Sequence, residues 1–323
     1  MRFTLKQMRY AEAAGRLGSI SAAAQELRIS QSSIAAAIDG IEASLGVDLF
    51  LRQPAKGVVA TPAGRRAMDL MREMLSAASA LESEFDCLDG AARGALRLGC
   101  YETLAPQVLP PLLKGFSARC PEARIDLSEG DLAEMRARLA AGEVDLAVTY
   151  MRGGEADAAE AAGAFLPLID AHPYALVPAD SALAERREVA LGDLAARPFV
   201  LLDLPRTRDY FTGLFRAAGL EFEIAHSTRS PEMLRALVGA GFGVSILNIR
   251  SGREDEPGSP VRCRPLAGGL EAPRLRVATT PGLRRPFMAR AFLDLARELR
   301  EAGAFRPFVA PPPPAATPFL GVL

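Results

Sequence analysis

The first sixty positions carry apolar residues at the spacing of short helices. In the first run these positions recur every three residues, at Leu5, Met8, Ala11 and Ala14. They predict a helix that ends at Gly18. A second helix is predicted over Ser21–Leu27, behind a serine N-cap. A third is predicted over Gln31–Leu45, where Gly46 stops it.

A hairpin and then a long helix follow. Two β-prone pieces, Asp48–Leu51 and Gly57–Ala60, enclose a turn, so residues 1–61 have the element order of a winged helix-turn-helix. Residues 62–90 are predicted to form a linker helix, because no helix breaker stands between Gly64 and Leu88, and its length would be roughly 40 Å. Its apolar stripe consists of Met68, Met71, Leu75, Ala78 and Phe85. This stripe predicts a two-helix dimerisation coil, with packing on the helix's own domain as the alternative.

From residue 94 the pattern changes to alternating strands and helices. Strand-like runs are Ala95–Gly99, Arg124–Ser128, Asp145–Tyr150, Tyr174–Val177, Phe199–Leu202, Gly243–Leu247 and Leu275–Thr280. Helical runs are Leu104–Ser117, Leu132–Ala141, Thr207–Ala218, Pro231–Ala240 and Pro286–Ala302. Such alternation predicts mostly parallel sheets with helices on both faces. The domain 94–304 is large for one sheet, so we expect one lobe of about 94–165 and 267–304 and a second of about 166–266.

Charge is unevenly divided along the chain. The 323 residues carry 38 Lys plus Arg and 39 Asp plus Glu, a formal charge of −1. Residues 1–66 hold nine basic and five acidic groups, so this head carries +4 and the remainder carries −5. A basic head suits a nucleic-acid partner even though the whole chain is nearly neutral.

Composition also limits the class of protein. With 49% hydrophobic and 24% charged residues, the chain is typical of a soluble protein. Four scattered cysteines without CxxC spacing, and histidines only at His172 and His226, predict reduced thiols and no metal site. We find no signal-peptide core and no apolar run that could cross a membrane, so we expect a cytoplasmic protein with no membrane partner. The proline-rich end, 305–323, predicts a flexible tail.

The strongest functional signal lies around the third helix. Two helices joined at Arg28–Ser30 would place the second one in the major groove of DNA. Ser30 is expected to cap that helix, and its first turn presents Gln31, Ser32 and Ser33, whose side chains read base edges. Basic side chains around this helix are expected to bind phosphates: Arg9, Arg16, Arg52 and Lys56.

Several stretches of the head keep the residues and spacing of a known family. They are Gly18-Ser19-Ile20-Ser21-Ala22-Ala23-Ala24, Leu27-x-Ile29-Ser30-Gln31-Ser32, Ile41-Glu42-x-x-Leu45-Gly46-Val47-x-Leu49-Phe50-x-Arg52 and Thr61-Pro62-Ala63-Gly64. In these stretches the chain resembles the LysR-type transcriptional regulators. The body resembles them too, at Asp145–Val148 and Leu237–Val244, so the resemblance covers residues 3–303.

The resemblance implies an all-α winged helix-turn-helix on a long linker helix, followed by an α/β body of two lobes like the periplasmic solute-binding proteins. It implies that the chain binds double-stranded DNA at an inverted-repeat promoter site as a homodimer or homotetramer. A small-molecule effector between the lobes would change the oligomer geometry on DNA, and RNA polymerase is a candidate partner. One departure concerns the third helix, where Ala35, Ala36 and Ala37 stand at positions that are often polar or basic in the family.

The loops that follow the strands predict the ligand site, because pockets in open α/β sheets lie at the carboxyl ends of strands. By the resemblance, these loops line the cleft between the lobes. The candidate residues are Cys100, Tyr101, Glu102, Thr103, Thr149, Tyr150, Asp203, Arg206, Arg208, Ser230 and Phe242. Thr103 is predicted to cap a helix whose free amides face an anion. Arg206 or Arg208 favours a carboxylate, and the nearby acids allow an amine, so a small acid or amino acid is expected.

Other functions lack the residues that they need. Gly239-x-Gly241-x-Gly243 has the glycine spacing of a dinucleotide loop, but a helix precedes it and a strand follows, which is the reverse order. Ser245 lacks the second glycine of a nucleophile elbow and a neighbouring histidine. We therefore expect no catalytic residue and no cofactor. The alternatives are a solute-binding protein that uses only the body, an enzyme on an α/β scaffold, and a helix-turn-helix used only for packing.

Overall fold

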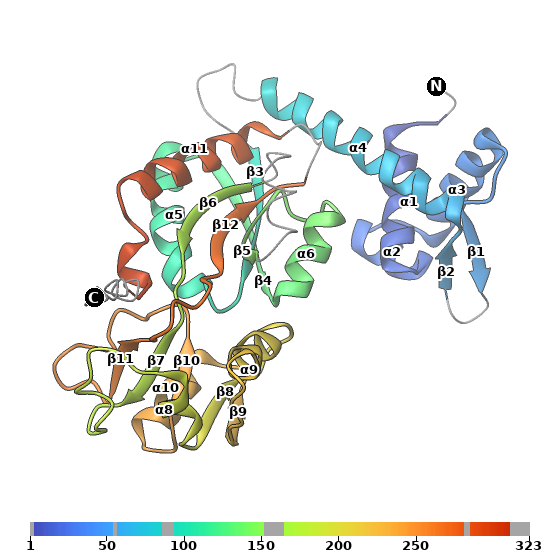
Figure 1. Cartoon of the computed structure of the whole chain (residues 1–323). Coiled ribbons are helices and arrows are strands. Elements are labelled where there is room, and N and C mark those ends of the chain that lie inside the picture. The colour runs from blue at the N-terminus through green and yellow to red at the C-terminus, as the bar shows by residue number, and fades with distance from the viewer. Residues whose placement is uncertain (1–2, 54–56, 86–93, 152–164, 281–284, 311–323) are drawn as a thin grey trace, which may run out of the picture.

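A computed structural model describes residues 3–53, 57–85, 94–151, 165–280 and 285–310 of the chain. It begins with the predicted three helices and a two-stranded hairpin (Figure 1). These elements are α1 (Leu5–Leu17), α2 (Ile20–Leu27), α3 (Gln31–Leu45), β1 (Phe50–Gln53) and β2 (Gly57–Ala60). The strands pair antiparallel, which confirms the predicted winged helix-turn-helix. We call these elements the head.

Local signals in the sequence determine where the head's helices begin and end. Gly18 and Gly46 adopt left-handed backbone conformations that end α1 and α3. The Ser30 hydroxyl caps α3 by accepting a hydrogen bond from the Ser33 amide at 3.2 Å. Helix α2 begins one residue before its predicted start, because Ser19 is its N-cap. The largest buried side chains of the head's core include Met8, Ile34, Ile38, Ile41 and Leu49.

In the long helix α4 (Pro62–Phe85), the first part of the predicted apolar stripe faces the head. Met71 is buried against the head core, and Met68 and Leu75 are partly buried beside it. The dimerisation seam predicted at these positions is therefore wrong for them, because the helix packs on its own domain. Another face of α4 exposes Leu70 and Met74.

The first lobe of the body is a five-stranded mixed sheet with helices on both faces. Its strand order is β4-β3-β5-β12-β6, and its strands are β3 (Gly94–Tyr101), β4 (Ala123–Gly130), β5 (Leu146–Met151), β6 (Phe165–Asp170) and β12 (Arg274–Ala278). Strand β12 is antiparallel to both of its neighbours. Helices α5 (Ala105–Arg119) and α11 (Phe287–Glu301) lie side by side, and α6 (Leu132–Ala140) lies across the sheet from them (Figure 1).

The second lobe contains a three-stranded and a two-stranded sheet. Their orders are β10-β7-β11 and β8-β9. The strands are β7 (Tyr174–Pro178), β8 (Phe199–Leu202), β9 (Ile224–Thr228), β10 (Ser245–Leu247) and β11 (Val261–Pro265), and the helices are α8 (Leu191–Ala195), α9 (Thr207–Ala217) and α10 (Pro231–Gly239). The expectation of mostly parallel sheets is wrong, because β7 pairs antiparallel with both neighbours. In the first lobe β12 is likewise antiparallel to β5 and β6, so the described strands of the body pair in parallel only between β3 and its neighbours β4 and β5 and between β8 and β9.

Two segments cross between the lobes. Strand β6 belongs to the first sheet, so the first lobe extends through Asp170, past the boundary of about 165 that we expected, and the first crossing follows it. The second crossing leads from β11 to β12. The Ala171 amide donates a hydrogen bond to the Pro273 carbonyl at 2.9 Å, which joins the two crossings. Figure 1 shows the lobes above and below this junction.

The start of the expected tail is packed on the body. Residues 306–308 form a short 3-10 helix, and Phe305 and Ala310 are buried. The Phe308 carbonyl accepts a hydrogen bond from the Arg250 amide at 2.9 Å. The prediction of a flexible tail is therefore wrong for residues 305–310, and its remainder, 311–323, lies outside the described residues.

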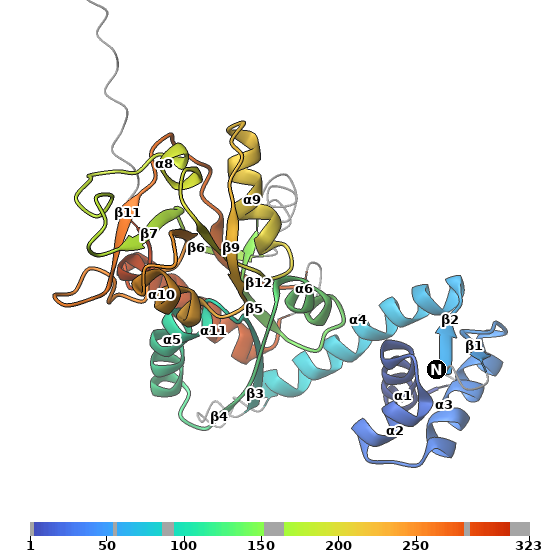
Figure 2. The same ribbon diagram turned by 90° about the horizontal axis from the view of Figure 1, so that it is seen from below.

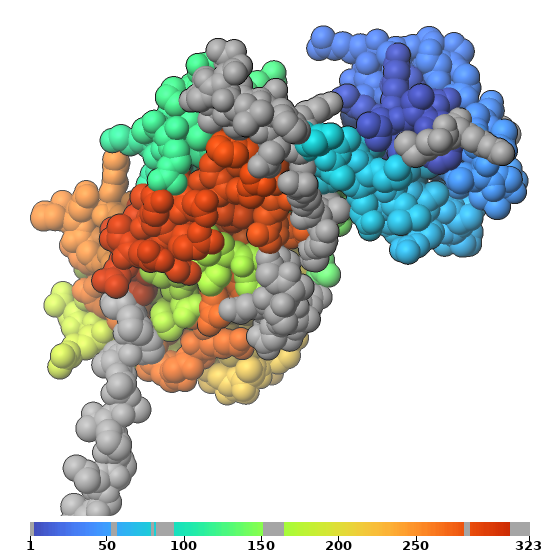
Figure 3. Space-filling model, turned by 90° about the horizontal axis from the view of Figure 1, so that it is seen from above, coloured from blue at the N-terminus to red at the C-terminus, as the bar shows by residue number. Residues whose placement is uncertain are grey.

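Helix α4 leads from the head toward the body, and the head lies to one side of the body (Figures 2 and 3). In Figures 1 and 2 helix α6 is the part of the body that faces the head, while α3 lies on the head's far side. Among the described residues, no helix has the length and apolar character needed to span a bilayer.

Candidate nucleic-acid interface and ligand cleft

The first turn of α3 presents the residues predicted to read bases. Gln31, Ser32 and Ser33 are exposed, and so is their neighbour Ser30. The Ser30 hydroxyl lies 2.9 Å from that of Ser32 and 2.8 Å from that of Ser33. The Gln31 side-chain amide donates to the Ser21 hydroxyl on α2 at 3.3 Å. The turn therefore offers one amide and three hydroxyls, each of which hydrogen-bonds base edges or phosphates.

The four basic residues predicted to bind phosphates have different surroundings. Arg9 is exposed on α1. Arg52, on the wing strand β1, forms an ion pair with Asp39 of α3, and about half of each side chain is exposed. Lys56 lies outside the described residues. Arg16 is surrounded by carboxylates, so the structure gives it a different contact from the one expected.

Arg16 connects the head to the body. Its guanidinium pairs with Glu26 of α2, with Glu12 at 3.8 Å and with Glu143 of the body at 3.3 Å. Burial disfavours its charge, but these carboxylates outweigh burial and raise the pKa of Arg16. Burial raises the pKa of the Glu12 carboxyl. In this arrangement Arg16 holds the head against the body, and only 17% of its side chain is exposed.

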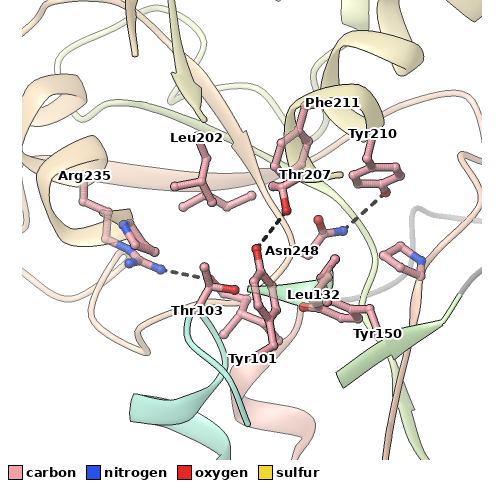
Figure 4. Close-up of a pocket in the computed structure, with 14 residues that line it drawn as sticks. Tyr101, Thr103, Leu132, Tyr150, Leu202, Thr207, Tyr210, Phe211, Arg235 and Asn248 are labelled. Atoms are coloured by element: carbon pink, nitrogen blue, oxygen red, sulfur yellow. Dashed lines mark hydrogen bonds between the residues drawn. The ribbon is translucent and has the colours of Figure 1, made fainter. Parts of the chain in front are cut away.

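A small cavity of about 40 Å³ lies between the lobes (Figure 4). The first lobe contributes Tyr101, Thr103, Leu132 and Tyr150. The Tyr101 and Tyr150 rings meet edge to face, with centroids 6.0 Å apart. Burial raises the pKa of Tyr101, and hydrogen bonds with Thr207 and Thr103 act in the opposite direction. The cavity is therefore lined on this side by two phenols and a threonine.

The second lobe closes the cavity. Its polar lining residues are Thr207, Tyr210, Arg235 and Asn248, and its apolar ones are Leu202, Phe211, Pro231, Leu247 and Ile249. The hydroxyls of Tyr101 and Thr207 lie 2.8 Å apart, so a hydrogen bond joins the two lobes directly. The Asn248 amide donates to the Ala171 carbonyl at 2.8 Å, which ties the cleft to the lobe crossing. Pro273, on the second crossing, completes the lining.

Of the eleven residues predicted for the cleft, the structure brings Tyr101, Thr103 and Tyr150 together there. The other eight do not line the cavity: Cys100, Glu102, Thr149, Asp203, Arg206, Arg208, Ser230 and Phe242. The prediction failed for these eight residues for two reasons. Successive side chains at a strand end point to opposite faces of the sheet, and loop residues also cap helices or pair with one another.

Particular contacts show where those side chains lie. Cys100 is buried in the core, Ser230 caps α10, and Phe242 is half exposed with its ring against His226. Arg208 pairs with Asp203 at 2.9 Å. The predicted Thr103 cap is wrong as well: α5 begins after Leu104 and has no side-chain cap. The anion site expected at that helix start therefore lacks its cap.

The polar cleft residues that the sequence did not predict come from α9, from α10 and from the position directly after β10. Thr207 is the first residue of α9 and stands between the predicted Arg206 and Arg208, and Tyr210 lies one turn further along that helix. Asn248 directly follows β10, so the rule that pockets lie at strand ends would have found it. Arg235 lies in the middle of α10, where only the folded structure shows which side faces the cleft.

Two family descriptions match the chain. "Bacterial regulatory helix-turn-helix protein, lysR family" matches residues 5–65, and "LysR substrate binding domain" matches residues 89–301, which is more than half of the chain. The chain belongs to the LysR family of transcriptional regulators. LysR-type regulators bind DNA and small-molecule effectors and form oligomers, and the matched relatives are regulators and not enzymes.

Curated relatives of this LysR-type regulator cover most of its length. A Streptomyces viridosporus protein named "Probable hydrogen peroxide-inducible genes activator" is 30% identical over 286 residues, 87% of this chain and 88% of its own. The regulator CysB of Haemophilus influenzae is 26% identical over 255 residues, 75% of each chain.

Solved LysR-type structures share its fold. HinK from Pseudomonas aeruginosa is 33% identical with a TM-score of 0.57, covering 92% of this chain and 98% of its own. Full-length CbnR in complex with its target DNA is 25% identical with a TM-score of 0.51, covering 92% of this chain and 100% of its own.

Proposed function

We propose that this LysR-type regulator responds to a small molecule in the cleft between its lobes by changing how its heads are placed on DNA. Helix α6 carries this proposal. Leu132, its first residue, lines the cleft. At its other end the Ala140 carbonyl accepts a hydrogen bond from Arg72 of α4 at 2.6 Å, and Glu143 pairs with Arg16 of α1. One short helix and the turn that follows it therefore contact the cleft, the linker helix and the head.

An oligomer would convert this coupling into a change in head spacing. Helix α4 exposes Leu70, Met74 and Leu81, with exposed fractions of 43%, 39% and 57%. We infer that a second copy covers this face, which would bring two heads to an inverted-repeat site. Two linked heads gain affinity from effective concentration. Contact with RNA polymerase stays a prediction.

Replacement of Gln31 tests the assignment of the DNA-reading face. We expect Gln31→Ala to reduce discrimination at the contacted base pair by about 1–3 kcal/mol, because a bidentate amide contact is lost. The measurement is fluorescence anisotropy with the full chain, on a duplex selected from a randomised library and on its single-base variants.

The matched control for Gln31 is Arg9→Ala, an exposed cation on α1. It should weaken binding to every duplex alike and reduce the slope of log affinity against log salt by about one. If both variants weaken all duplexes equally, Gln31 does not read bases.

The ion pair between Arg52 and Asp39 predicts that the recognition helix restrains the wing. Arg52 has to break its ion pair with Asp39 before it can contact a phosphate, so we expect Asp39→Asn to raise DNA affinity about threefold. That factor corresponds to a free energy within the range measured for exposed ion pairs. The slope of log affinity against log salt should steepen by about one. The control is Asp48→Asn, which removes the same charge from another exposed site of the head. If the two variants raise DNA affinity equally, the gain comes from the change in net charge and not from the release of Arg52.

Removal of the Glu143 carboxylate tests the path through α6. We expect DNA binding to slow backbone hydrogen exchange in residues 132–143 and in the loops around Tyr101 and Thr207. In Glu143→Gln this slowing should fall by more than half, because the head then lacks its ion pair with the body. The readout is hydrogen-exchange mass spectrometry of the full chain with and without a saturating duplex.

The matched control for Glu143 is Glu26→Gln, which also removes a carboxylate from Arg16 but lies within the head. It should keep the exchange response. The path through α6 is wrong if wild type shows no response in the cleft loops, or if both variants keep it. DNA binding itself is measured in parallel, so its loss would be recognised as a failure of the head.

The peroxide-linked names of some relatives raise a second mode of control, thiol oxidation. Peroxide reacts with accessible thiolates. The three cysteines that the structure describes, Cys100, Cys120 and Cys263, are buried and form no disulfide among themselves. Burial raises the pKa of Cys100 and of Cys263 well above the ordinary thiol value. These features favour a ligand-responsive regulator, and Cys87 lies outside the described residues.

A further inference from the structure

Arg235 is the one charged side chain among the residues that line the described cleft. Its guanidinium is already engaged by the protein. Nε donates to the Glu254 carboxylate at 3.0 Å, Nη2 donates to the Ile249 carbonyl at 2.9 Å, and Nη1 lies 3.6 Å from Glu232. An anionic ligand would therefore have to compete with two carboxylates for this cation.

Glu254 neutralises Arg235 from within the protein. The carboxylate is 1% exposed and accepts a second hydrogen bond, from the Ser251 amide at 2.6 Å. Burial alone would raise the pKa of Glu254, but the Ser251 amide and the charge of Arg235 outweigh it and hold the pKa below 4.5. The charge of Arg235 is thus cancelled by a buried and permanently ionised partner at neutral pH.

The arginines expected to bind a carboxylate lie elsewhere. Arg206 and Arg208 are exposed and do not line the cavity, and Arg208 pairs with Asp203. What the cleft offers instead is flat aromatic surface and neutral hydrogen-bonding groups. The rings belong to Tyr101, Tyr150, Tyr210 and Phe211.

The neutral polar groups surround those rings on both lobes. They include the hydroxyls of Thr103 and Thr207 and the amide of Asn248 (Figure 4). Such groups bind uncharged donors and acceptors, whereas burying an unpaired carboxylate among them would cost several kcal/mol by general estimates of charge burial. The lining therefore favours an uncharged ligand that carries both a ring and a polar group.

The geometry points to a cleft that selects a small uncharged molecule with a flat ring and hydrogen-bonding substituents, and that rejects the matching carboxylate. This inference rests on the proposed function, which makes the cleft the effector site. A cavity of about 40 Å³ is smaller than the roughly 150 Å³ that holds benzene elsewhere. Ligand entry therefore separates the Tyr101 and Thr207 hydroxyls, and the ligand takes over their hydrogen bond.

Matched neutral and acidic compounds test the selection. The full chain is screened at millimolar concentrations by thermal shift and titration calorimetry with benzamide, nicotinamide and phenols, and with benzoate, nicotinate and hydroxybenzoates. We expect binding confined to the uncharged series, with at least a tenfold preference within each amide–acid pair. Equal or tighter binding of the acids would overturn the inference, and so would the absence of binding by every uncharged compound.

Glu254→Gln reverses the charge balance without removing the hydrogen-bond acceptor. In this variant Arg235 loses its buried counter-ion and keeps only the exposed Glu232, so benzoate should bind at least tenfold more tightly than to wild type, and the preference for benzamide should vanish. Glu232→Gln is the control, because that side chain is 67% exposed and its carboxylate lies farther from the guanidinium, at 3.6 Å, than that of Glu254, so the variant should keep the wild-type preference. Wild-type selectivity in Glu254→Gln would overturn the inference.

Thr207→Val provides a second variant should Glu254→Gln fail to fold. It nearly preserves volume and removes one hydroxyl from the cleft, so binding of benzamide should weaken about fivefold or more. Unchanged binding would contradict the assigned site. DNA affinity is measured in the presence of each compound that binds. If a compound binds selectively but leaves DNA affinity unchanged, the proposed function is refuted, whereas the inferred ligand class still holds.

Discussion

Gly64→Ala is expected to unfold the head and abolish DNA binding. A Cβ atom at position 64 would lie 1.9 Å from the Leu49 carbonyl oxygen, closer than any van der Waals contact allows. That carbonyl also accepts a hydrogen bond from the Thr61 amide, so it cannot move without breaking the junction between the wing and α4. We expect a loss of about 3 kcal/mol or more, a large share of the stability of a domain of this size.

The measurements are DNA affinity by anisotropy and hydrogen exchange of head peptides in the full chain. Gly46→Ala is the matched control: its φ is +71°, and no atom lies within 4 Å of the added Cβ. It should cost about 1–2 kcal/mol from backbone conformation alone and leave the head folded. If Gly64→Ala behaves like Gly46→Ala, the close approach at Leu49 is not a constraint.

Arg235→Met is expected to destabilise the body by about 3–5 kcal/mol, because it leaves the buried Glu254 carboxylate without its cation. The double variant R235M/E254L should recover most of that loss, since apolar side chains then replace both charges. Urea denaturation of the full chain, followed through the body's exchange-protected peptides, measures the differences. A double variant as unstable as the single one would show that the pair itself is needed for the fold.

The same pair predicts a pH dependence. The pKa of Glu254 is lower in the folded body than its ordinary value of 4.5, so folding favours the ionised form. The stability that this contributes is complete above pH 4.5 and is lost as the pH falls through the lower, folded pKa. R235M/E254L should lack this contribution, so the pH profiles of wild type and double variant should converge only below pH 4.5.

Local patterns in the sequence were sufficient to predict the head. Helix periodicity, the serine cap at Ser30 and the glycine stops at Gly18 and Gly46 all act within a few residues, so each can be read without knowing the fold. The same patterns could not show which face of α4 meets the head. Its apolar residues suit a partner helix and a protein core equally well, and only packing distinguishes them.

Unlike the head, the ligand cleft could be predicted from the sequence only in part. Tyr101, Thr103 and Tyr150 were predicted from their places at strand ends, a rule that follows from the topology of open sheets. Charge was predicted poorly, because the sequence cannot show that Arg208 folds back onto Asp203 or that Glu254 neutralises Arg235 across 19 positions. The sequence shows the sign of each side chain's charge, but it does not show which other side chain lies nearest to it in the folded protein.

The sequence by itself determined the type of protein: a basic helix-turn-helix head, a long helix and an α/β body, each encoded by short-range spacing and composition. The tertiary structure alone decided the character of the cleft and its connection to the head. Both depend on pairs far apart in the chain, such as Tyr101 with Thr207 and Arg16 with Glu143. Contacts of that kind arise from how the lobes and helices pack, and local spacing does not specify them.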